Sequence, residues 1–202
     1  MNIAVQAQKI IEKTFAYSDN KDVTLKLQIA DSIKITTWDK NEVSVKASIS
    51  IAENRYNDEY KVDFNDSKDG ITVDAKIESK RKNNWNEDSN CCNTDIYWEI
   101  YVPAKAPIEV ETINGNIVIT GQTGRVKAHS ISGFIDLQIP KDLKADFRLS
   151  TITGTVYSNI LDKESVTAKK GSADFNSRYN GGGTAVDLKT ISGDIFLRDP
   201  SR

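Results

Sequence analysis

The second half of the chain repeats a short phrase centred on a glycine, as in ETINGNIVITG and LKTISGDIFL. The repeated glycines are Gly115, Gly133, Gly154, Gly171 and Gly193. Apolar residues recur at the same offsets around them, and only the copy at Gly171 departs strongly from the pattern. Because one unit of about 20 residues cannot bury its apolar side chains alone, successive copies are expected to stack and to share a core.

Each copy is predicted to form two short strands that bend near the glycine. Apolar side chains stand seven and five residues before it, as at Ile108 and Val110, and two and four residues after it, as at Ile117 and Ile119. An isoleucine also stands two residues before four of the glycines: Ile113, Ile131, Ile152 and Ile191. Period-two alternation predicts that all of these side chains, and the glycines, face inward. The three-residue step ahead of the isoleucine requires a bend or bulge there.

The positions predicted to face solvent are mostly hydroxyl and amide residues. They are Thr112, Asn114, Ser130, Ser132, Thr151, Thr153, Thr190 and Ser192. Stacked in register, these side chains would form ladders on a solvated face. The inward glycine, which lacks a side chain, would allow a tight bend or the close approach of the next layer.

These repeats predict an all-β chain built on a parallel β-solenoid, a β-helix-like repeat with right-handed coiling. A β-sandwich is the alternative, since sandwich strands also recur roughly every 8 to 12 residues. The solenoid is preferred because the same residue types recur at matching offsets, which a sandwich does not require. Helix is expected at most in residues 7–15.

The first half of the chain is less regular and predicts longer strands. LQIADSIKITTWD fits the repeat as a degenerate copy with Asp31 in the glycine place. Longer strands are expected at 43–51, at 60–64 and 71–77 around the hairpin signal DSKDG, and in DIYWEIYVP. In the last of these, one face carries Ile96, Trp98, Ile100 and Val102. These strands are expected to be antiparallel and to flank the solenoid, whose edge would otherwise be open.

Length and charge limit the number of domains and the kinds of partner. A chain of 202 residues can bury about 70% of the surface of its unfolded form. Lys and Arg number 27 against 29 Asp and Glu, so no strong field favours nucleic acid as a partner. No apolar run is long enough to span a bilayer.

The first residues, MNIAVQAQ, resemble the end of an export signal, with Val5 and Ala7 placed as at a signal-peptidase site. Residues 1–7 are therefore interpreted as a signal-peptide remnant, and an ordinary polar N-terminus is the alternative. Residues 8–202 are expected to form a single elongated β domain, irregular over about 20–102 and regular over 103–202. No cysteine follows the site closely, so no N-terminal lipid anchor is predicted.

Catalytic residues are not predicted by any pattern in the chain. His129 is the single histidine and lacks the second anchoring motif that a nucleophilic triad needs. Asp136, Asp174 and Asp194 lie on different copies and would matter for polysaccharide cleavage, but they do not share one offset from their glycines. They are interpreted as solvated residues of the outer face.

Two adjacent cysteines, Cys91 and Cys92, lie in the polar stretch KRKNNWNEDSNCCN. A disulfide between neighbours would hold their Cα atoms about 3.8 Å apart, below the usual range, and would be strained. A vicinal disulfide, intermolecular pairing and two unpaired loop thiols remain open. With one histidine and no paired CxxC motifs, neither a metal site nor a cofactor is predicted.

Two further motifs are interpreted as ordinary surface structure. NGGGTAVDL resembles the calcium-binding nonapeptide of solenoid toxins, but Asp187 falls one residue late and the motif occurs once, so a turn is expected. The run Lys80–Lys82 beside Trp85 could contact an anionic glycan or lipid headgroup, although such a run is usually solvated. No binding residue is assigned.

The phrases IKITTWDKNEVSVKAS, IYVPAKAPIEVETINGNIVITG, SISG and TISGDIFL together resemble the bacterial putative-adhesin family of unknown function, found in envelope proteins of Bacteroidetes. The resemblance runs from about Lys21 to Leu197, and the chain departs from it at Asp31, where glycine is usual, and in the cysteine-bearing loop. It implies a β-helical or β-roll protein that is exported, periplasmic or on the cell surface, and it supplies no catalytic motif.

Two functions from different classes follow as hypotheses. The first is a non-enzymatic envelope or surface module that binds a glycan, an envelope protein or a neighbouring subunit, including a homo-oligomer. The second is a carbohydrate-active enzyme on a short β-helix. A third hypothesis is that the chain serves only as a structural spacer. The hydroxyl ladders favour the first.

Overall fold

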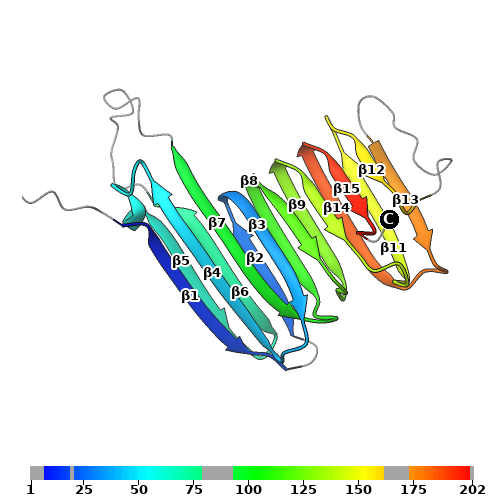
Figure 1. Cartoon of the computed structure of the whole chain (residues 1–202), viewed down its shortest axis with the longest axis horizontal. Helices are drawn as coiled ribbons and strands as arrows, with labels where there is room; N and C mark the ends of the chain where they lie inside the picture. Colours follow the sequence, from blue (N-terminus) through cyan, green and yellow to red (C-terminus); the bar gives the residue numbers. More distant parts are fainter. Residues whose placement is uncertain (1–6, 19–20, 79–92, 162–172, 201–202) are drawn as a thin grey trace, which may run out of the picture.

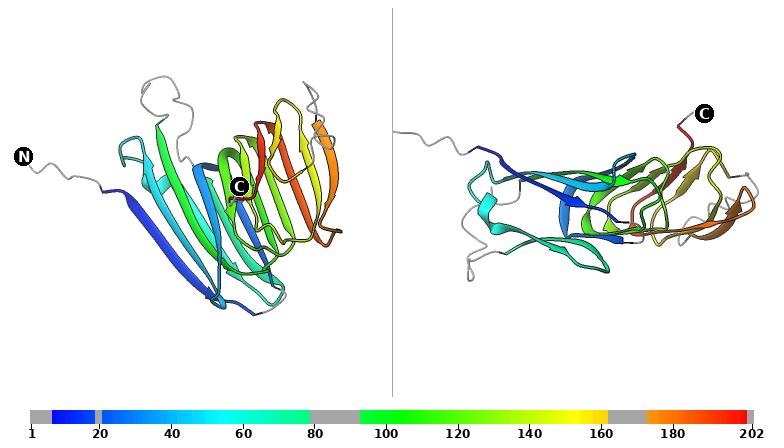
Figure 2. Two further views of the ribbon diagram at one scale, coloured as in Figure 1. Left: turned by 45° about the vertical axis from the view of Figure 1, so that its right-hand side comes forward. Right: turned by 90° about the horizontal axis from the view of Figure 1, so that it is seen from below.

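The computed structural model describes residues 7–18, 21–78, 93–161 and 173–200, and this part of the chain is almost entirely β-structure (Figure 1). The one helical element in it is a single 3-10 turn at Asn57–Glu59. Seen from below, the strands form two layers that face each other (Figure 2). We call them layer A and layer B. The predicted all-β class is confirmed.

Hydrogen-bonded neighbours define the strand order of each layer. Layer A runs β5 (Tyr60–Asp66), β6 (Gly70–Ile77), β2 (Asp22–Leu27), the first part of β8 (Ile108–Thr120), β9 (Val126–Ser132), β14 (Thr184–Ser192), β11 (Ala145–Thr151) and β13 (Ala173–Tyr179). Layer B runs β1 (Lys9–Ala16), β4 (Glu42–Ile51), β7 (Thr94–Pro103), β3 (Ile29–Trp38), the second part of β8, β10 (Ile135–Gln138), β15 (Ile195–Arg198) and β12 (Val156–Ser158).

Strand β8 belongs to both layers and shows how one copy of the repeat is built. Its residues 108–114 pair with β2 and β9, whereas its residues 117–120 pair with β3 and β10. The copies at Gly115, Gly133, Gly154 and Gly193 each contribute one strand to layer A, an arc at the glycine, and one strand to layer B. The two predicted strands are confirmed for these four copies, and β2 with β3 forms the degenerate copy at Asp31.

The copies do not stack in the order in which they occur in the sequence. The copy at Gly193 lies between those at Gly133 and Gly154, because β14 pairs with both β9 and β11, and β15 with both β10 and β12. The start of the fourth predicted copy, at Gly171, lies outside the described residues, and the strand after it, β13, is antiparallel to β11. The sheet is thus mixed and open, and a continuous solenoid is not confirmed.

The turn in NGGGTAVDL explains this change of order. Asn180 donates hydrogen bonds from Nδ2 to the carbonyl oxygens of Lys141 and Leu143, both at 2.9 Å. The turn therefore crosses the end of β11 and returns the chain as β14 on the other side of that strand. Gly181 and Gly182 have positive φ angles of 87° and 80°. The predicted turn is confirmed.

Antiparallel strands flank the repeats at the N-terminal end of the layers, as expected. β1, β4 and β7 are antiparallel in layer B, and β5 and β6 form the hairpin in layer A. Residues 7–15 are the one segment for which the sequence allows a helix, but the structure places most of this segment in strand β1. Its pairing with β4 over eight residues, together with the packing of Phe15 against Phe64, outweighs local helix propensity.

The core lies between the layers, where the side chains two and four residues after the glycines meet those of the opposite layer. Ile117, Ile119, Ile135, Leu137, Ile195 and Leu197 are buried there, as are the four residues predicted to share one face of β7. Tyr60 from layer A packs on Trp98 from layer B with ring centroids 6.4 Å apart. These inward assignments are confirmed.

The isoleucines two residues before the glycines, however, face outward. Ile113 and Ile152 are each 49% exposed and Ile131 is 41% exposed, whereas Thr112, Ser130, Thr151 and Thr190 are buried. The predictions for both sets are wrong. Inward parity continues to the position three before the glycine, and the chain then turns the corner with two consecutive residues outside. Asn114, Ser132, Thr153 and Ser192 do face solvent as predicted.

Buried hydroxyls and glycines hold the arcs together. The Ser130 hydroxyl donates to the carbonyl oxygen of Gly115 at 3.2 Å, and the Thr190 hydroxyl donates to the carbonyl oxygen of Gly193 at 2.7 Å. A Cβ at Gly133, whose φ is +126°, would lie 2.2 Å from the Gly115 carbonyl oxygen. The glycines therefore permit the close approach of neighbouring copies, as predicted.

Candidate functional site

Asp136 is a buried carboxylate on the outer side of layer B, and it forms an ion pair with the half-exposed Arg198. Its carboxylate accepts a hydrogen bond from Arg198 Nε at 2.9 Å, a second from Arg198 Nη2, and one from Gln138 Nε2 at 3.0 Å. The hydrogen bonds to Asp136 raise the pKa of Arg198 above its usual value. Asp136 is 3% exposed, so its interpretation as a solvated residue is wrong. Both oxygens of the Asp136 carboxylate are engaged in hydrogen bonds to side chains of the protein itself.

The other two acidic residues weighed for polysaccharide cleavage lie elsewhere. Asp194 accepts a hydrogen bond from the backbone N–H of Thr155 at 2.8 Å and thereby joins two neighbouring arcs. Asp174 is exposed on β13 in layer A. Asp136 lies on β10 in layer B, so the structure does not bring the three carboxylates into one groove.

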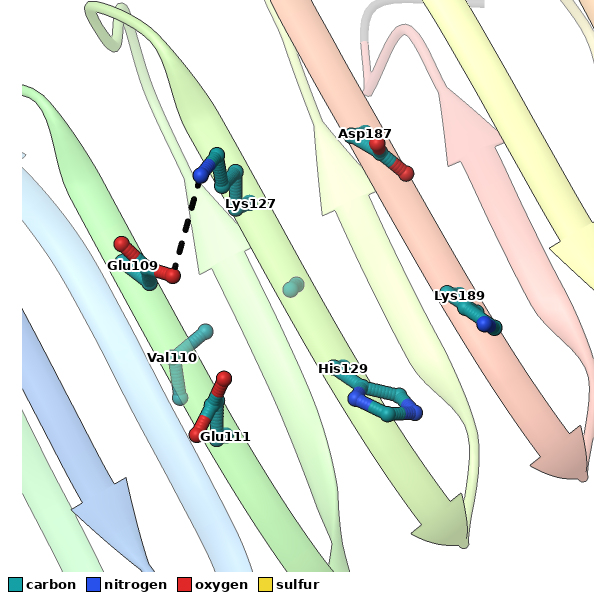
Figure 3. Close-up of a pocket in the computed structure, with 8 residues that line it drawn as sticks. Glu109, Val110, Glu111, Lys127, His129, Asp187 and Lys189 are labelled. Atoms are coloured by element: carbon teal, nitrogen blue, oxygen red, sulfur yellow. Dashed lines mark ion pairs between the residues drawn. The ribbon is translucent and has the colours of Figure 1, made fainter.

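His129 lies in a pocket on the outer face of layer A, among charged residues of β8, β9 and β14 (Figure 3). Its direct neighbours across the sheet are Glu111 and Lys189. In the next row, Lys127 stands between Glu109, with which it forms an ion pair at 3.8 Å, and Asp187. No serine or cysteine lines this pocket, so its described residues do not supply a nucleophilic triad.

The outer face of layer B has a different chemistry, centred on two exposed tyrosines of β7. Tyr97 is 44% exposed and Tyr101 is 39% exposed. Ser32 and Ser48 stand directly beside Tyr97, and Thr36 and Ser44 directly beside Tyr101. We call these six residues the tyrosine face. Tyrosines among small hydroxyl residues provide rigid amphipathic contact area together with adaptable hydrogen bonding, the composition found in antibody binding sites.

Trp38, at the end of β3, extends the apolar surface of the tyrosine face. Its ring stacks on Tyr101 with centroids 5.0 Å apart and planes 25° from parallel. The indole Nε1 donates to the carbonyl oxygen of Glu42 at 2.8 Å, and Lys40 Nζ lies 4.6 Å from the ring centroid. These contacts fix the orientation of the indole before any ligand arrives.

A second aromatic cluster lies on the same layer at the opposite end of the molecule. Tyr157 stacks on Phe196 with centroids 5.1 Å apart, and Phe134 meets Phe196 edge to face at 5.9 Å. The Arg198 guanidinium lies 5.3 Å from the Phe196 centroid. The faces of the Phe196 ring are therefore engaged within the protein, and of this cluster Tyr157 is the most exposed member.

Several residues that the sequence analysis considered as candidate binding or redox residues lie outside the part of the chain that the structure describes. Cys91, Cys92, the run Lys80–Lys82 and Trp85 lie outside the described residues. Within the described ranges, no three His, Cys, Asp or Glu side chains lie close enough together to hold a metal ion. In the same ranges, no helix is long and apolar enough to cross a membrane.

Sequence reasoning noted the inward face of β7 but missed Tyr97 and Tyr101 on its outward face. The alternation in DIYWEIYVP could have shown both tyrosines to be outward. The small residues beside them could not be identified, because the pairing of β3 and β4 with β7 joins segments far apart in the chain.

The fold is an open, two-layer all-β scaffold with a charged outer face on one layer and aromatic residues on the outer face of the other. It is similar to a putative cell adhesion protein from Clostridium sporogenes, with a TM-score of 0.57 and 14% identity over 96% of this chain and 100% of that one. This likeness establishes the shared fold.

Weaker similarities come from the genus Parabacteroides. A putative lipid binding protein from Parabacteroides distasonis has a TM-score of 0.38 at 12% identity, over 94% of this chain and 61% of that one. A putative adhesin from Parabacteroides merdae has a TM-score of 0.34 at 9% identity, over 74% and 59%. No family profile matches the chain. The predicted resemblance to adhesin-like proteins is confirmed at the level of the fold, through the likeness to the putative cell adhesion protein from Clostridium sporogenes.

Proposed function

We propose that the chain is a non-enzymatic adhesin-like module, exported to the bacterial periplasm or cell surface, that binds its ligand through the outer face of layer B. The observation that carries this proposal is the position of the exposed aromatic side chains. Tyr97, which is 44% exposed, and Tyr101, which is 39% exposed, both lie on that face among small hydroxyl residues of β3 and β4. Exposed aromatic groups are typical of binding surfaces.

The scaffold supports this role in two ways. Arcs closed by buried hydroxyls and glycines make a rigid support, and a site on strands is positioned more accurately than one on loops. In this proposal residues 8–202 act as one elongated domain, with the repeats of 103–202 as a solenoid-like support. The export-like pattern in residues 1–7 and the fold shared with the putative cell adhesion protein from Clostridium sporogenes favour the envelope as its location.

A binding screen tests the proposal. Purified protein is incubated with immobilised polysaccharides and proteins, and both retention and product release are measured. We expect retention on at least one surface without product release, reduced in Tyr97→Ala/Tyr101→Ala and unchanged in the layer A variant Lys127→Ala/Lys189→Ala. Product release that is lost in Asp136→Asn or Asp174→Asn would instead identify a carbohydrate-active enzyme. Absence of retention by a folded protein on every surface would favour a structural spacer.

A further inference from the structure

We propose that the tyrosine face binds a neutral polysaccharide, with sugar rings packed on Tyr97 and Tyr101 and sugar hydroxyls bonded to the charged row between them. This inference rests on the proposed function and names its ligand class. The apolar C–H face of a pyranose ring packs well on an aromatic ring, while the phenol hydroxyl and its polar neighbours can bond to the sugar hydroxyls. Both kinds of group are present here.

The spacing of the two tyrosines suits an extended chain of several sugars. Tyr97 and Tyr101 are four residues apart on one strand, which places them about 13 Å from each other along β7. The residues directly beside them are serine and threonine, whose side chains are much shorter than a tyrosine. The Tyr97 ring therefore stands above its direct neighbours, whereas one face of the Tyr101 ring is covered by the stacked Trp38 ring, and a ligand would pack on the other.

The row between the tyrosines decides between a polysaccharide and a protein as the ligand. Glu99 lies on β7 halfway between them, with Lys34 directly beside it on β3 and Lys46 on β4. The cores of protein–protein interfaces are depleted of charged residues, so a charged row between two aromatic anchors does not fit such a partner. A carboxylate and two ammonium groups are, by contrast, good hydrogen-bond partners for sugar hydroxyls.

Charge balance in this row favours a neutral polysaccharide. Lys46 forms an ion pair with Glu12 at 3.0 Å, and the hydrogen bond to Glu12 raises the pKa of Lys46 above its usual value. Glu12, Lys46, Glu99 and Lys34 thus follow one another across β1, β4, β7 and β3 with alternating sign. Two negative and two positive groups leave no excess charge to attract an anionic polymer.

The test uses the whole chain and soluble hexasaccharides of β-1,4-linked glucose, β-1,4-linked N-acetylglucosamine and α-1,4-linked glucose, with polygalacturonate as the anionic comparison. Titration calorimetry measures the affinity, and thermal unfolding checks that each variant is folded. We expect at least one neutral hexasaccharide to bind, with affinity reduced at least 10-fold in Tyr97→Ala and in Tyr101→Ala. Tyr97→Phe retains the stacking ring and should stay within about threefold of the unchanged protein.

Tyr157→Ala is the matched control, because Tyr157 is also an exposed tyrosine of layer B but lies in the other aromatic cluster. It should leave hexasaccharide affinity within twofold. An equal loss in Tyr157→Ala and Tyr97→Ala would overturn the assignment to the tyrosine face, as would stronger binding of polygalacturonate. Retention on a protein surface, lost in the double tyrosine variant, with no hexasaccharide bound would refute the glycan class and leave the proposed function standing. Binding to nothing at all by the folded protein would refute both.

Discussion

Two columns of isoleucines run along the stacked copies and flank the same glycines, yet they lie in opposite environments. The column two residues after the glycine, which includes Ile117 and Ile195, is buried, while the column two residues before it, which includes Ile113 and Ile131, is 41% to 49% exposed at these two positions. Symmetry in the sequence is therefore not symmetry in the fold. The difference arises at the arc, where two consecutive residues face outward and the parity of the strand changes.

The residue that faces inward just before the arc is a serine or threonine, and its hydroxyl forms a hydrogen bond that stabilises the arc. Thr112, Ser130, Thr151 and Thr190 each bond a backbone carbonyl of an arc. In the degenerate copy, the Tyr60 hydroxyl donates to the carbonyl oxygen of Ile29 at 3.0 Å. A buried carbonyl at a bend needs a partner, and a serine or threonine provides one that an isoleucine could not. This explains why the apolar side chain is the one displaced to the surface.

Truncation of a buried isoleucine should have the largest effect. Ile117→Ala removes apolar contacts and leaves a cavity between the layers, so we expect the free energy of unfolding to fall by about 2 to 5 kcal/mol. Denaturant titration measures it. Ile113→Ala, in the same copy, is the matched control and should stay within about 0.5 kcal/mol. Equal losses in the two variants would show that the columns do not differ in burial.

The next largest effect on stability should come from alkaline pH, through ionisation of Tyr60 at the arc of the degenerate copy. Burial raises the pKa of Tyr60 from 10.0 to about 12, against a smaller opposing contribution from its hydrogen bond with Trp98. Between these two pH values the unfolded chain loses a proton that the folded chain keeps, so stability falls as pH rises. The contribution of Tyr60 is fully present below pH 10, and about 2 to 3 kcal/mol of it is lost by pH 12.

Comparison with Tyr60→Phe isolates this contribution from the other groups that titrate in the same range. Unfolding free energies of both proteins are measured at steps between pH 9 and 12. The variant should start less stable at pH 9 and lose less stability on the way to pH 12. Parallel curves for the two proteins would mean that Tyr60 is not held as a neutral phenol between the layers.

Loss of one buried hydroxyl should have a smaller effect. The Thr190 hydroxyl lies 2.7 Å from the Gly193 carbonyl oxygen and 2.8 Å from the Thr151 hydroxyl. Thr190→Val keeps the shape but removes these bonds, and we expect a loss of about 1 to 2 kcal/mol, seen as a lower Tm. Ser192→Ala, two residues further on and exposed, should change Tm very little. A Thr190→Val protein as stable as the unchanged one would place the hydroxyl outside the arc.

Much of the fold follows from local sequence patterns, whereas the order of the strands and the position of the tyrosine face depend on pairing between segments that are distant in the sequence. The alternation around Ile117 and Ile195 predicts their burial, and the DSKDG hairpin is visible in the sequence alone. The insertion of β14 between β9 and β11 is not, because it depends on how the turn at Asn180 crosses β11. The tyrosine face is hidden for the same reason, since β7 builds it together with β3 and β4, which lie far from β7 in the sequence.

The outer isoleucine column should tolerate polar substitution with the smallest effect of all. Ile131 is 41% exposed at its arc, so Ile131→Lys exposes little new apolar surface and removes none from the core. We expect the free energy of unfolding to stay within about 0.5 kcal/mol. Ile135→Lys, four residues on in the same copy, would place an unpaired charge in the core and should prevent folding. Destabilisation of the Ile131→Lys protein by several kcal/mol would mean that this column packs against something, and a mass measurement in solution would show whether a second copy of the chain covers it.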